Sequence, residues 1–413
     1  MLQPKLKKPK LLIFLAIFIV AFLLRAQETI FNNYLFLMDM GRDMIGVKGI
    51  IYDHHLTLIG PHTSLGGVFQ GPLWYYLLSI PTFLLRGDPW GAVALMLVIS
   101  LTTAVIAFFF MNRLFGFSAS VITFLLIAIS PEAVAAATYI WNPHPMWLLT
   151  ALYIFFLFMV VSGKQKFHLL LWPTITLMSH FQTALAVFLF FATLLFFLII
   201  KWKFNIRKYL IFGLLISGVF FIPQAVFDVR HDFLMTKSII SLVKGEDRGL
   251  SVTNEVKDKK IINFHKDQYI NNFKSSFLSS GYITHFPAIV ALISLIVFIK
   301  RRRDFSKNEV LFIKTTLSIA VMVYLISMFY PFPLRYWYFT GFQMFYILPI
   351  GLILSKLWNF SLGKAAILLF VISIVPFLFN RINDLYVKHP QDNNYAKIKA
   401  IKSAVDYIYK DAK

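Results

Sequence analysis

The sequence predicts an all-α protein that crosses a membrane about eleven times, and three observations support this fold class. Of the 413 residues, 58% are hydrophobic and only 14% are charged. The apolar residues form many long runs, and a helix needs about 20 such residues to span a bilayer. Lys and Arg stand in short clusters between the runs, which is typical of anchors on the cytoplasmic side.

The basic clusters order the predicted helices. When every cluster is placed in the cytoplasm, a single path results, with the N-terminus inside. The first ten residues and the apolar run behind them have the charge pattern of a signal peptide, but no small-residue cleavage site follows, so we expect an uncleaved first helix. The predicted spans are residues 11–27, 91–112, 117–137, 145–161, 166–179, 183–200, 208–225, 284–299, 309–329, 336–355 and 364–380.

Residues 72–85 are apolar but fit this path poorly as a span. If they crossed the membrane, every later basic cluster would change sides. The segment is short, contains Pro81 and carries Trp74, Tyr75 and Tyr76, and Trp and Tyr favour membrane interfaces. We therefore expect an interfacial or re-entrant helix, and a twelfth span is the alternative.

The domain organisation follows from these positions. Residues 1–380 are predicted to form one transmembrane domain, with a long first external loop at 28–90 and an external polar insertion at 226–283. Residues 381–413 form a charged tail. Ile398, Ile401, Val405 and Ile408 recur in it at helical spacing, which predicts an amphipathic helix on a surface.

Two carboxylates and an arginine follow the first apolar run. In a helix, Asp39, Arg42 and Asp43 share one face, so either acid can pair with the guanidinium. Asp39 is the predicted general base because it stands first after the run, where partial burial would raise its pKa and Arg42 would lower it. The alternative is an ion pair that only ties the loop to the bundle.

Other polar residues fall on the same predicted face, which indicates one external site built from several loops. His180 could instead satisfy a backbone carbonyl, and Arg230 and His231 could be anchors at the end of a span. Arg335 lies away from the cytoplasmic clusters, so it is our first choice for neutralising a lipid-linked phosphate. The candidate binding residues are Arg42, Tyr75, Asn142, His180, Gln182, Arg230, His231, Arg335 and Tyr336.

Composition and motifs exclude several classes of function. The absence of cysteine excludes disulfides, a thiolate nucleophile and a cysteine metal site. No spacing of His, Asp and Glu gives a metal signature, so a divalent metal stays open without a ligand set. There is no nucleotide motif and no serine-histidine-acid pattern. The net charge of +21 is spread between apolar spans, where it suits anionic lipids rather than nucleic acid.

These motifs together resemble the membrane glycosyltransferases of the GT-C type, which use polyprenyl-phosphate sugars. More narrowly, they resemble the branch of protein O-mannosyltransferases and lipid A aminoarabinose transferases. The resemblance extends to about residue 380 and rests on the order of the motifs. They are residues 39–43, 71–76, 141–143, 179–182 and 227–231, and Arg335 with Tyr336.

The resemblance implies a donor in which dolichyl or undecaprenyl phosphate carries one sugar, with transfer to a hydroxyl on the external face and inversion at the anomeric carbon. Family members have an acid in the first external loop, often followed by a second acid and then an arginine. Asp39 and Arg42 match the outer positions, whereas Met40 replaces the second acid, and Asp43 is a candidate substitute. The acceptor is left open among protein, glycan and lipid.

A transporter or flippase for a lipid-linked or small polar substrate is the rival prediction. Such a protein would carry polar or broken helices near the middle of the membrane and some internal repeat. Here the polar clusters stand at the ends of the apolar runs, which favours the transferase.

Overall fold

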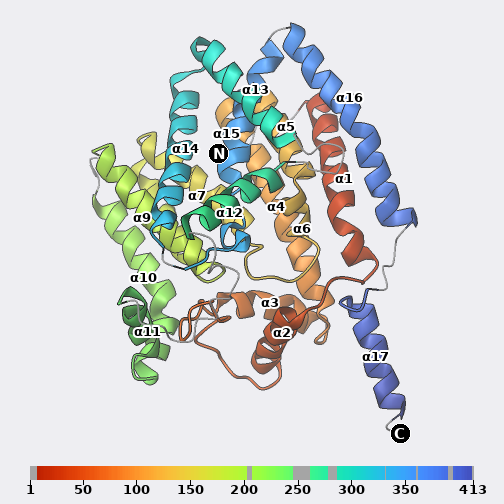
Figure 1. Cartoon of the computed structure of the whole chain (residues 1–413), viewed down its shortest axis with the longest axis vertical. Helices are drawn as coiled ribbons and strands as arrows, with labels where there is room; N and C mark the ends of the chain where they lie inside the picture. The colour runs from red at the N-terminus through yellow and green to blue at the C-terminus, as the bar shows by residue number, and fades with distance from the viewer. Residues whose placement is uncertain are drawn as a thin grey trace.

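The computed structural model describes residues 7–201, 207–244, 261–277, 286–330, 332–359, 361–388 and 394–411. These residues fold into α-helices and short helical turns, as the sequence predicts, and most of the helices run along one common direction (Figure 1). Their apolar faces enclose one large hydrophobic core, which includes Trp74, Trp147, Phe312 and Phe345.

Four helices among the described residues are long and apolar enough to cross a membrane, by length and composition: α1 (Lys8–Ile30), α4 (Trp90–Phe115), α10 (Arg207–Arg230) and α14 (Lys307–Met328). Other apolar helices fill the bundle between them and overlap the predicted spans. They are α5 (Phe117–Ile129), α7 (Met146–Val161), α8 (His168–Met178), α9 (Thr183–Ile199), α13 (Phe286–Lys300), α15 (Met344–Ser355) and α16 (Ser361–Asn383).

Some predicted helix bounds were wrong. Residues 117–137 are not one helix, because α5 ends at Ile129 and Pro131 begins the separate short α6 (Pro131–Ala135); proline has no N–H to continue the hydrogen-bond ladder. Residues 336–355 also divide, into the 3-10 turn η4 (Tyr336–Phe339) and α15. The last helix, α16, continues to Asn383, beyond the predicted end at residue 380.

A buried arginine joins three helices at the break between α5 and α6. Arg25 of α1 is fully buried and donates to the carbonyl oxygens of Ile127 (2.8 Å) and Ala128 (2.7 Å). Its Nε also donates to Ser100 Oγ on α4 at 3.0 Å. Carbonyl groups at the end of a helix lack the regular i+4 donor, so Arg25 donates to two of those of α5 and fixes α1 against α4 and α5.

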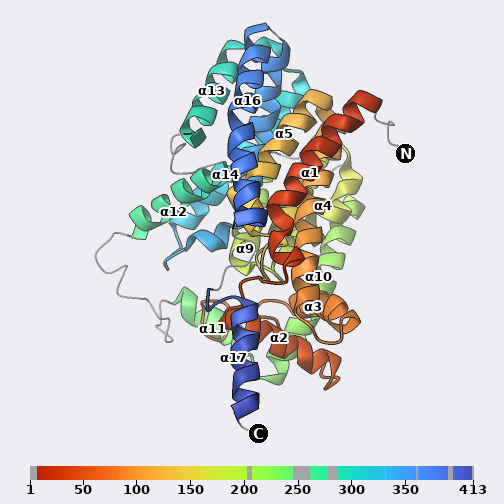
Figure 2. The ribbon, with the colours of Figure 1, turned by 90° about the vertical axis from the view of Figure 1, so that its right-hand side faces the viewer.

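Two helices of the first loop lie across one end of the bundle. These are α2 (Met38–Ile51) and α3 (Leu73–Leu84), which pack against each other (Figures 1 and 2). The apolar segment at 72–85 is thus helical, and its axis is turned away from the bundle axis. At the same end lie α11 (Leu234–Val243) and α17 (Ile398–Asp411), and α17 projects outward from the bundle.

The predicted polar insertion at 226–283 is partly helical. It holds the end of α10, then α11 and α12 (Ile261–Ser275), while residues 245–260 and 278–285 lie outside the described residues. From α12, Asn272 Nδ2 donates to the carbonyl oxygen of Phe339 at 3.0 Å, and His265 Nε2 lies 2.9 Å from the carbonyl oxygen of Phe332. The insertion thereby supports the segment that carries Arg335.

Replacing Arg25 tests its role as a clamp between helices. Arg25→Met leaves the carbonyl oxygens of Ile127 and Ala128 without their donor, so we expect a loss of about 2–3 kcal/mol in unfolding free energy. The thermal unfolding midpoint of the purified protein in detergent measures this loss of stability. Leu12→Met on the exposed face of the same helix is the control, and an unchanged midpoint for Arg25→Met would contradict the clamp.

Candidate functional site

The site begins with the short helix α2, whose first turn is fixed by its own sequence. Met40 is buried, and its sulfur accepts a hydrogen bond from the backbone N–H of Leu37 at 2.9 Å. Asp39 stands in the first turn, where a negative charge suits the helix dipole. Met40 therefore faces the core and stabilises the first turn of α2. Position 40, where the resembling family often has a second acid, thus has a structural role here.

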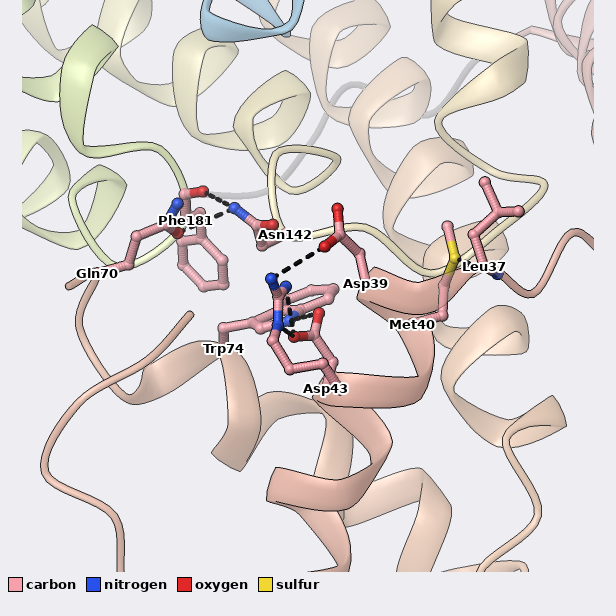
Figure 3. A network of polar contacts seen from close by, with 9 residues as sticks. Leu37, Asp39, Met40, Asp43, Gln70, Trp74, Asn142 and Phe181 are labelled. Carbon is pink, nitrogen blue, oxygen red and sulfur yellow. Dashed lines mark hydrogen bonds and ion pairs between the residues drawn. The ribbon is translucent and has the colours of Figure 1, made fainter. Parts of the chain in front are cut away.

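Arg42 joins the two carboxylates as the helical spacing predicts. Its Nη1 lies 3.0 Å from Asp39 Oδ1, and its Nη2 lies 2.8 Å from Asp43 Oδ1. Trp74 Nε1 of α3 donates to Asp43 Oδ2 at 2.7 Å (Figure 3). Both oxygens of Asp43 are thereby engaged, and the carboxylate connects α2 to α3.

The two acids differ in burial. The side chain of Asp43 is only 1% exposed, whereas that of Asp39 is 52% exposed. Burial raises the pKa of Asp43 above its ordinary value, although Arg42 and Trp74 act against the shift. The desolvation that the sequence suggested for Asp39 thus falls on Asp43, and Asp39 is the acid that a substrate can reach.

Tyr75 lies against the same group. Burial and the charge of Asp43 raise the pKa of Tyr75 to about 12, so it stays a neutral hydroxyl at pH 7. Gly46 of α2 permits this packing, because a Cβ there would come within 3.2 Å of the Tyr75 ring.

The loop between α2 and α3 reaches into the bundle through a narrow hairpin. The backbone N–H of Gly60 donates to the carbonyl oxygen of Gln70, and that of Gln70 donates to Pro61. Asn142, which is buried, donates from Nδ2 to Gln70 Oε1 at 2.9 Å and to the carbonyl oxygen of Phe181 at 2.6 Å (Figure 3). Three loops far apart in the sequence thus meet at this amide.

His180 is buried beside the same hairpin. Its Nδ1 lies 3.5 Å from the backbone nitrogen of Leu73, and its ring occupies the space next to Gly71, where a Cβ would come within 1.8 Å of Nδ1. Burial lowers the pKa of His180 to about 4. The ring is therefore neutral at pH 7 and cannot supply positive charge to a phosphate.

Gln182 and η4 complete this group of loops. The Nε2 of Gln182 donates to the carbonyl oxygen of Trp337 at 3.2 Å, and the Trp141 and Trp337 rings lie 6.4 Å apart. The Arg335 guanidinium lies over the Trp337 ring at 5.3 Å, and Tyr336 is 48% exposed. The hydroxyl of Tyr338 donates to Ser64 Oγ of the hairpin.

Arg230 and His231 stand apart from these contacts. Both are exposed at the end of α10, and the His231 ring stacks on Phe227 of the same helix at 4.0 Å. Among the described residues, no hydrogen bond or ion pair joins either of them to α2. Their neighbour Asp228 has a structural use, because it accepts hydrogen bonds from the backbone N–H of Met235 at 2.6 Å and from the Thr236 side chain, both at the start of α11.

The structure adds three residues that the sequence analysis did not single out for these roles. Trp74 holds Asp43, and Gln70 holds Asn142. The third is Glu132 of α6, a half-buried carboxylate whose charge acts on Tyr139 and Tyr336. Glu132 follows an apolar run, as Asp39 does, and that shared position was the signal available in the sequence.

In the described part of the chain, no three His, Asp or Glu side chains are grouped as metal ligands. The ion pairs at α2 bring together two carboxylates and one guanidinium. The group therefore has a net negative charge beside the exposed Asp39. Such an arrangement can accept a proton from a hydroxyl group, and it needs a cation from elsewhere to bind a phosphate.

Comparison with known proteins identifies the fold that this chain resembles. No protein-family model and no curated protein matches the sequence. The structure is similar to ArnT from Cupriavidus metallidurans bound to undecaprenyl phosphate, with a TM-score of 0.62 and 14% identity over 94% of this chain and 66% of that one. It is also similar to the oligosaccharyltransferase from Archaeoglobus fulgidus, with a TM-score of 0.53 and 16% identity over 89% of this chain and 52% of that one.

Both proteins are membrane glycosyltransferases of the GT-C type, so the expected resemblance to that all-α fold is confirmed. The chain spans about two thirds of the length of ArnT and about half of the oligosaccharyltransferase.

The close approach of Gly71 and His180 can be tested with a matched pair of variants. Gly71→Ala puts a Cβ into the His180 ring, so the hairpin must move; we expect the unfolding free energy to fall by about 1–3 kcal/mol. Gly49→Ala in α2, where no atom lies within 4 Å of the new Cβ, should be neutral or stabilise the helix by up to about 1 kcal/mol. Equal thermal midpoints for the two variants would contradict this packing.

The buried His180 also predicts a pH dependence of stability. Its pKa falls from 6.5 to about 4 on folding, so between these values the unfolded chain binds a proton that the folded chain does not. The contribution of neutral His180 to the unfolding free energy is complete above pH 6.5 and is lost as the pH falls towards 4. We expect the thermal midpoint of His180→Asn to fall less than that of the wild type between pH 6.5 and 4. The midpoint of His55→Asn, a substitution of an exposed histidine, should fall as much as that of the wild type. A pH profile like that of the wild type for His180→Asn would show that His180 does not contribute to this pH dependence.

Proposed function

We propose that the protein is a membrane glycosyltransferase that transfers one sugar from a polyprenyl-phosphate donor to a hydroxyl acceptor. The observation that carries this proposal is the first-loop helix α2, on which a reachable Asp39 is paired through Arg42 with the buried Asp43. The GT-C-like fold supports it over most of the chain. The undecaprenyl phosphate bound to ArnT supports a polyprenyl-phosphate donor.

The proposed topology has about eleven spans, with the active site on the external side of the cell membrane. In this arrangement α1, α4, α5 with α6, α7 to α10 and α13 to α16 cross the bilayer, and residues 28–90 form the first external loop. The N-terminal end of α1 and the turn between α13 and α14 lie at the end of the bundle opposite α2 (Figures 1 and 2). Both carry lysines or arginines, which supports a cytoplasmic position for that end.

In the proposed reaction Asp39 is the general base. The acceptor hydroxyl attacks the anomeric carbon, its proton passes to the Asp39 carboxylate, and the bond from that carbon to the phosphate oxygen breaks. The polyprenyl phosphate leaves with the electron pair, and the configuration inverts. Arg42 Nη1 contacts Asp39 Oδ1 at 3.0 Å, while Asp43, itself held by Trp74, keeps Arg42 in place.

The departing phosphate needs a cation that α2 does not supply. Arg42 is already shared between two carboxylates, and His180 is neutral. Arg335, on the segment that contacts both the hairpin and the Gln182 loop, is the proposed partner of the phosphate. Tyr75, Asn142, Gln182 and Tyr336 would shape the donor site around it, and Arg230 and His231 would lie at its margin.

Substitution of Asp39 tests the proposed base. In proteoliposomes with a polyprenyl-phosphate sugar, we expect Asp39→Asn to lower sugar transfer by about 10²–10⁴-fold, because the amide cannot accept the proton. The readout is the release of free polyprenyl phosphate on addition of an acceptor. Asp53→Asn, in the exposed loop just after α2, is the matched control and should turn over like the wild type.

Two results would contradict the proposal. Turnover near that of the wild type in a folded Asp39→Asn protein would remove Asp39 as the base. Movement of the intact lipid-linked sugar across the bilayer by the wild type, without release of polyprenyl phosphate for any acceptor supplied, would favour a flippase.

A further inference from the structure

The segment that leads into α2 is paired with a segment near the C-terminus. The backbone N–H of Phe36 donates to the carbonyl oxygen of Ala396 at 2.8 Å, and that of Ile398 donates to Tyr34 at 2.9 Å. Leu35 and Lys397 thus stand opposite each other in an antiparallel bridge. Residues 34–36 and 396–398 form a short two-stranded pairing, which we name the C-terminal strap.

Side chains fix the strap in one register. Lys397 Nζ lies 2.5 Å from Glu28 Oε1 at the end of α1, and the two side chains are only 13% and 16% exposed. Ile398 is buried in the main core, as is Tyr34 on the other strand. Farther along α17, the ion pair between Lys402 and Asp88 is exposed at 3.4 Å, so it stabilises the strap little.

The strap lies directly before the proposed reacting group. Leu37 alone separates the paired residues from α2, and Asp39 is the second residue of that helix. A slip of one residue in the pairing would shift the start of α2 by about 3.3 Å along the strand. It would also exchange the two faces of residues 34–36 and take Tyr34 out of the core. The register of the strap therefore determines where Asp39 points.

We propose that the C-terminal strap is a positioning element of the active site, with Lys397 and Glu28 as its positioning residues. This inference rests on the proposed glycosyl transfer at Asp39. Lys397 acts through the backbone of residues 34–36 and does not touch the reacting atoms. The half of α17 beyond Lys402 is mostly exposed, so it is not part of the positioning element.

An engineered disulfide tests the strap in a chain with no native cysteine. The two hydrogen bonds flank Leu35 and Lys397, which makes them a non-hydrogen-bonded pair with Cα atoms about 4.5 Å apart. That separation suits a disulfide. We expect the Leu35→Cys/Lys397→Cys protein to form this bond on oxidation, as seen by mass spectrometry of its peptides, while each single variant forms none within the chain.

The activity of the same protein then separates positioning from simple stability. When reduced, it lacks the Lys397–Glu28 ion pair, and we expect kcat to fall about 10- to 100-fold with little change in the KM for the donor. Oxidation should restore most of the lost kcat, because the covalent bond replaces the ion pair. Ile408→Ser, in the exposed half of α17, should keep the kcat of the wild type in both states.

Each outcome bears on one claim. Wild-type kcat in the reduced double variant, or a disulfide that never forms in the folded protein, would overturn the strap as a positioning element while leaving the transferase in place. A wild-type protein that transfers no sugar would overturn the proposed function and the positioning proposal that rests on it. In that case the yield of the disulfide still reports whether the two segments are paired.

Discussion

The buried carboxylate of Asp43 is the interaction on which this end of the molecule depends. It is 1% exposed and is held by Arg42 at 2.8 Å and by Trp74 at 2.7 Å. A buried charge without such partners would cost several kcal/mol, so the ion pair and the indole N–H must stay in place. Because the two partners come from α2 and α3, the satisfied carboxylate also fixes how these helices cross.

This arrangement gives the two acids different roles. Asp43 has partners on both oxygens, so it is suited to hold Arg42 rather than to meet a substrate. Asp39 shares the same guanidinium but is 52% exposed. Around them, the hairpin and the loops at Asn142, Gln182 and Trp337 contact one another directly. A rigid set of loops on a helical bundle can keep a base and a cation at fixed positions, which catalysis by orientation requires.

The helices were predictable from the sequence because apolar runs and basic clusters are local signals. The helical face shared by Asp39, Arg42 and Asp43 was predictable for the same reason. Burial was not, since the buried carboxylate of Asp43 is held by Trp74, 31 residues away along the chain. The contacts of Lys397 with Glu28, 369 residues apart, lie beyond any local pattern. Pro131, which begins α6 and divides the helix expected at 117–137, is the local signal for that break.

The proposed reacting centre lies beside Asp39, between α2 and the segment that carries Arg335. A cryo-electron microscopy structure of the protein in lipid nanodiscs with undecaprenyl phosphate tests it most directly. We expect density for the phosphate within hydrogen-bond distance of Arg335 and on the same side of the bilayer as Asp39. Density for the phosphate at the opposite end of the bundle, or none at a saturating concentration, would contradict the claim.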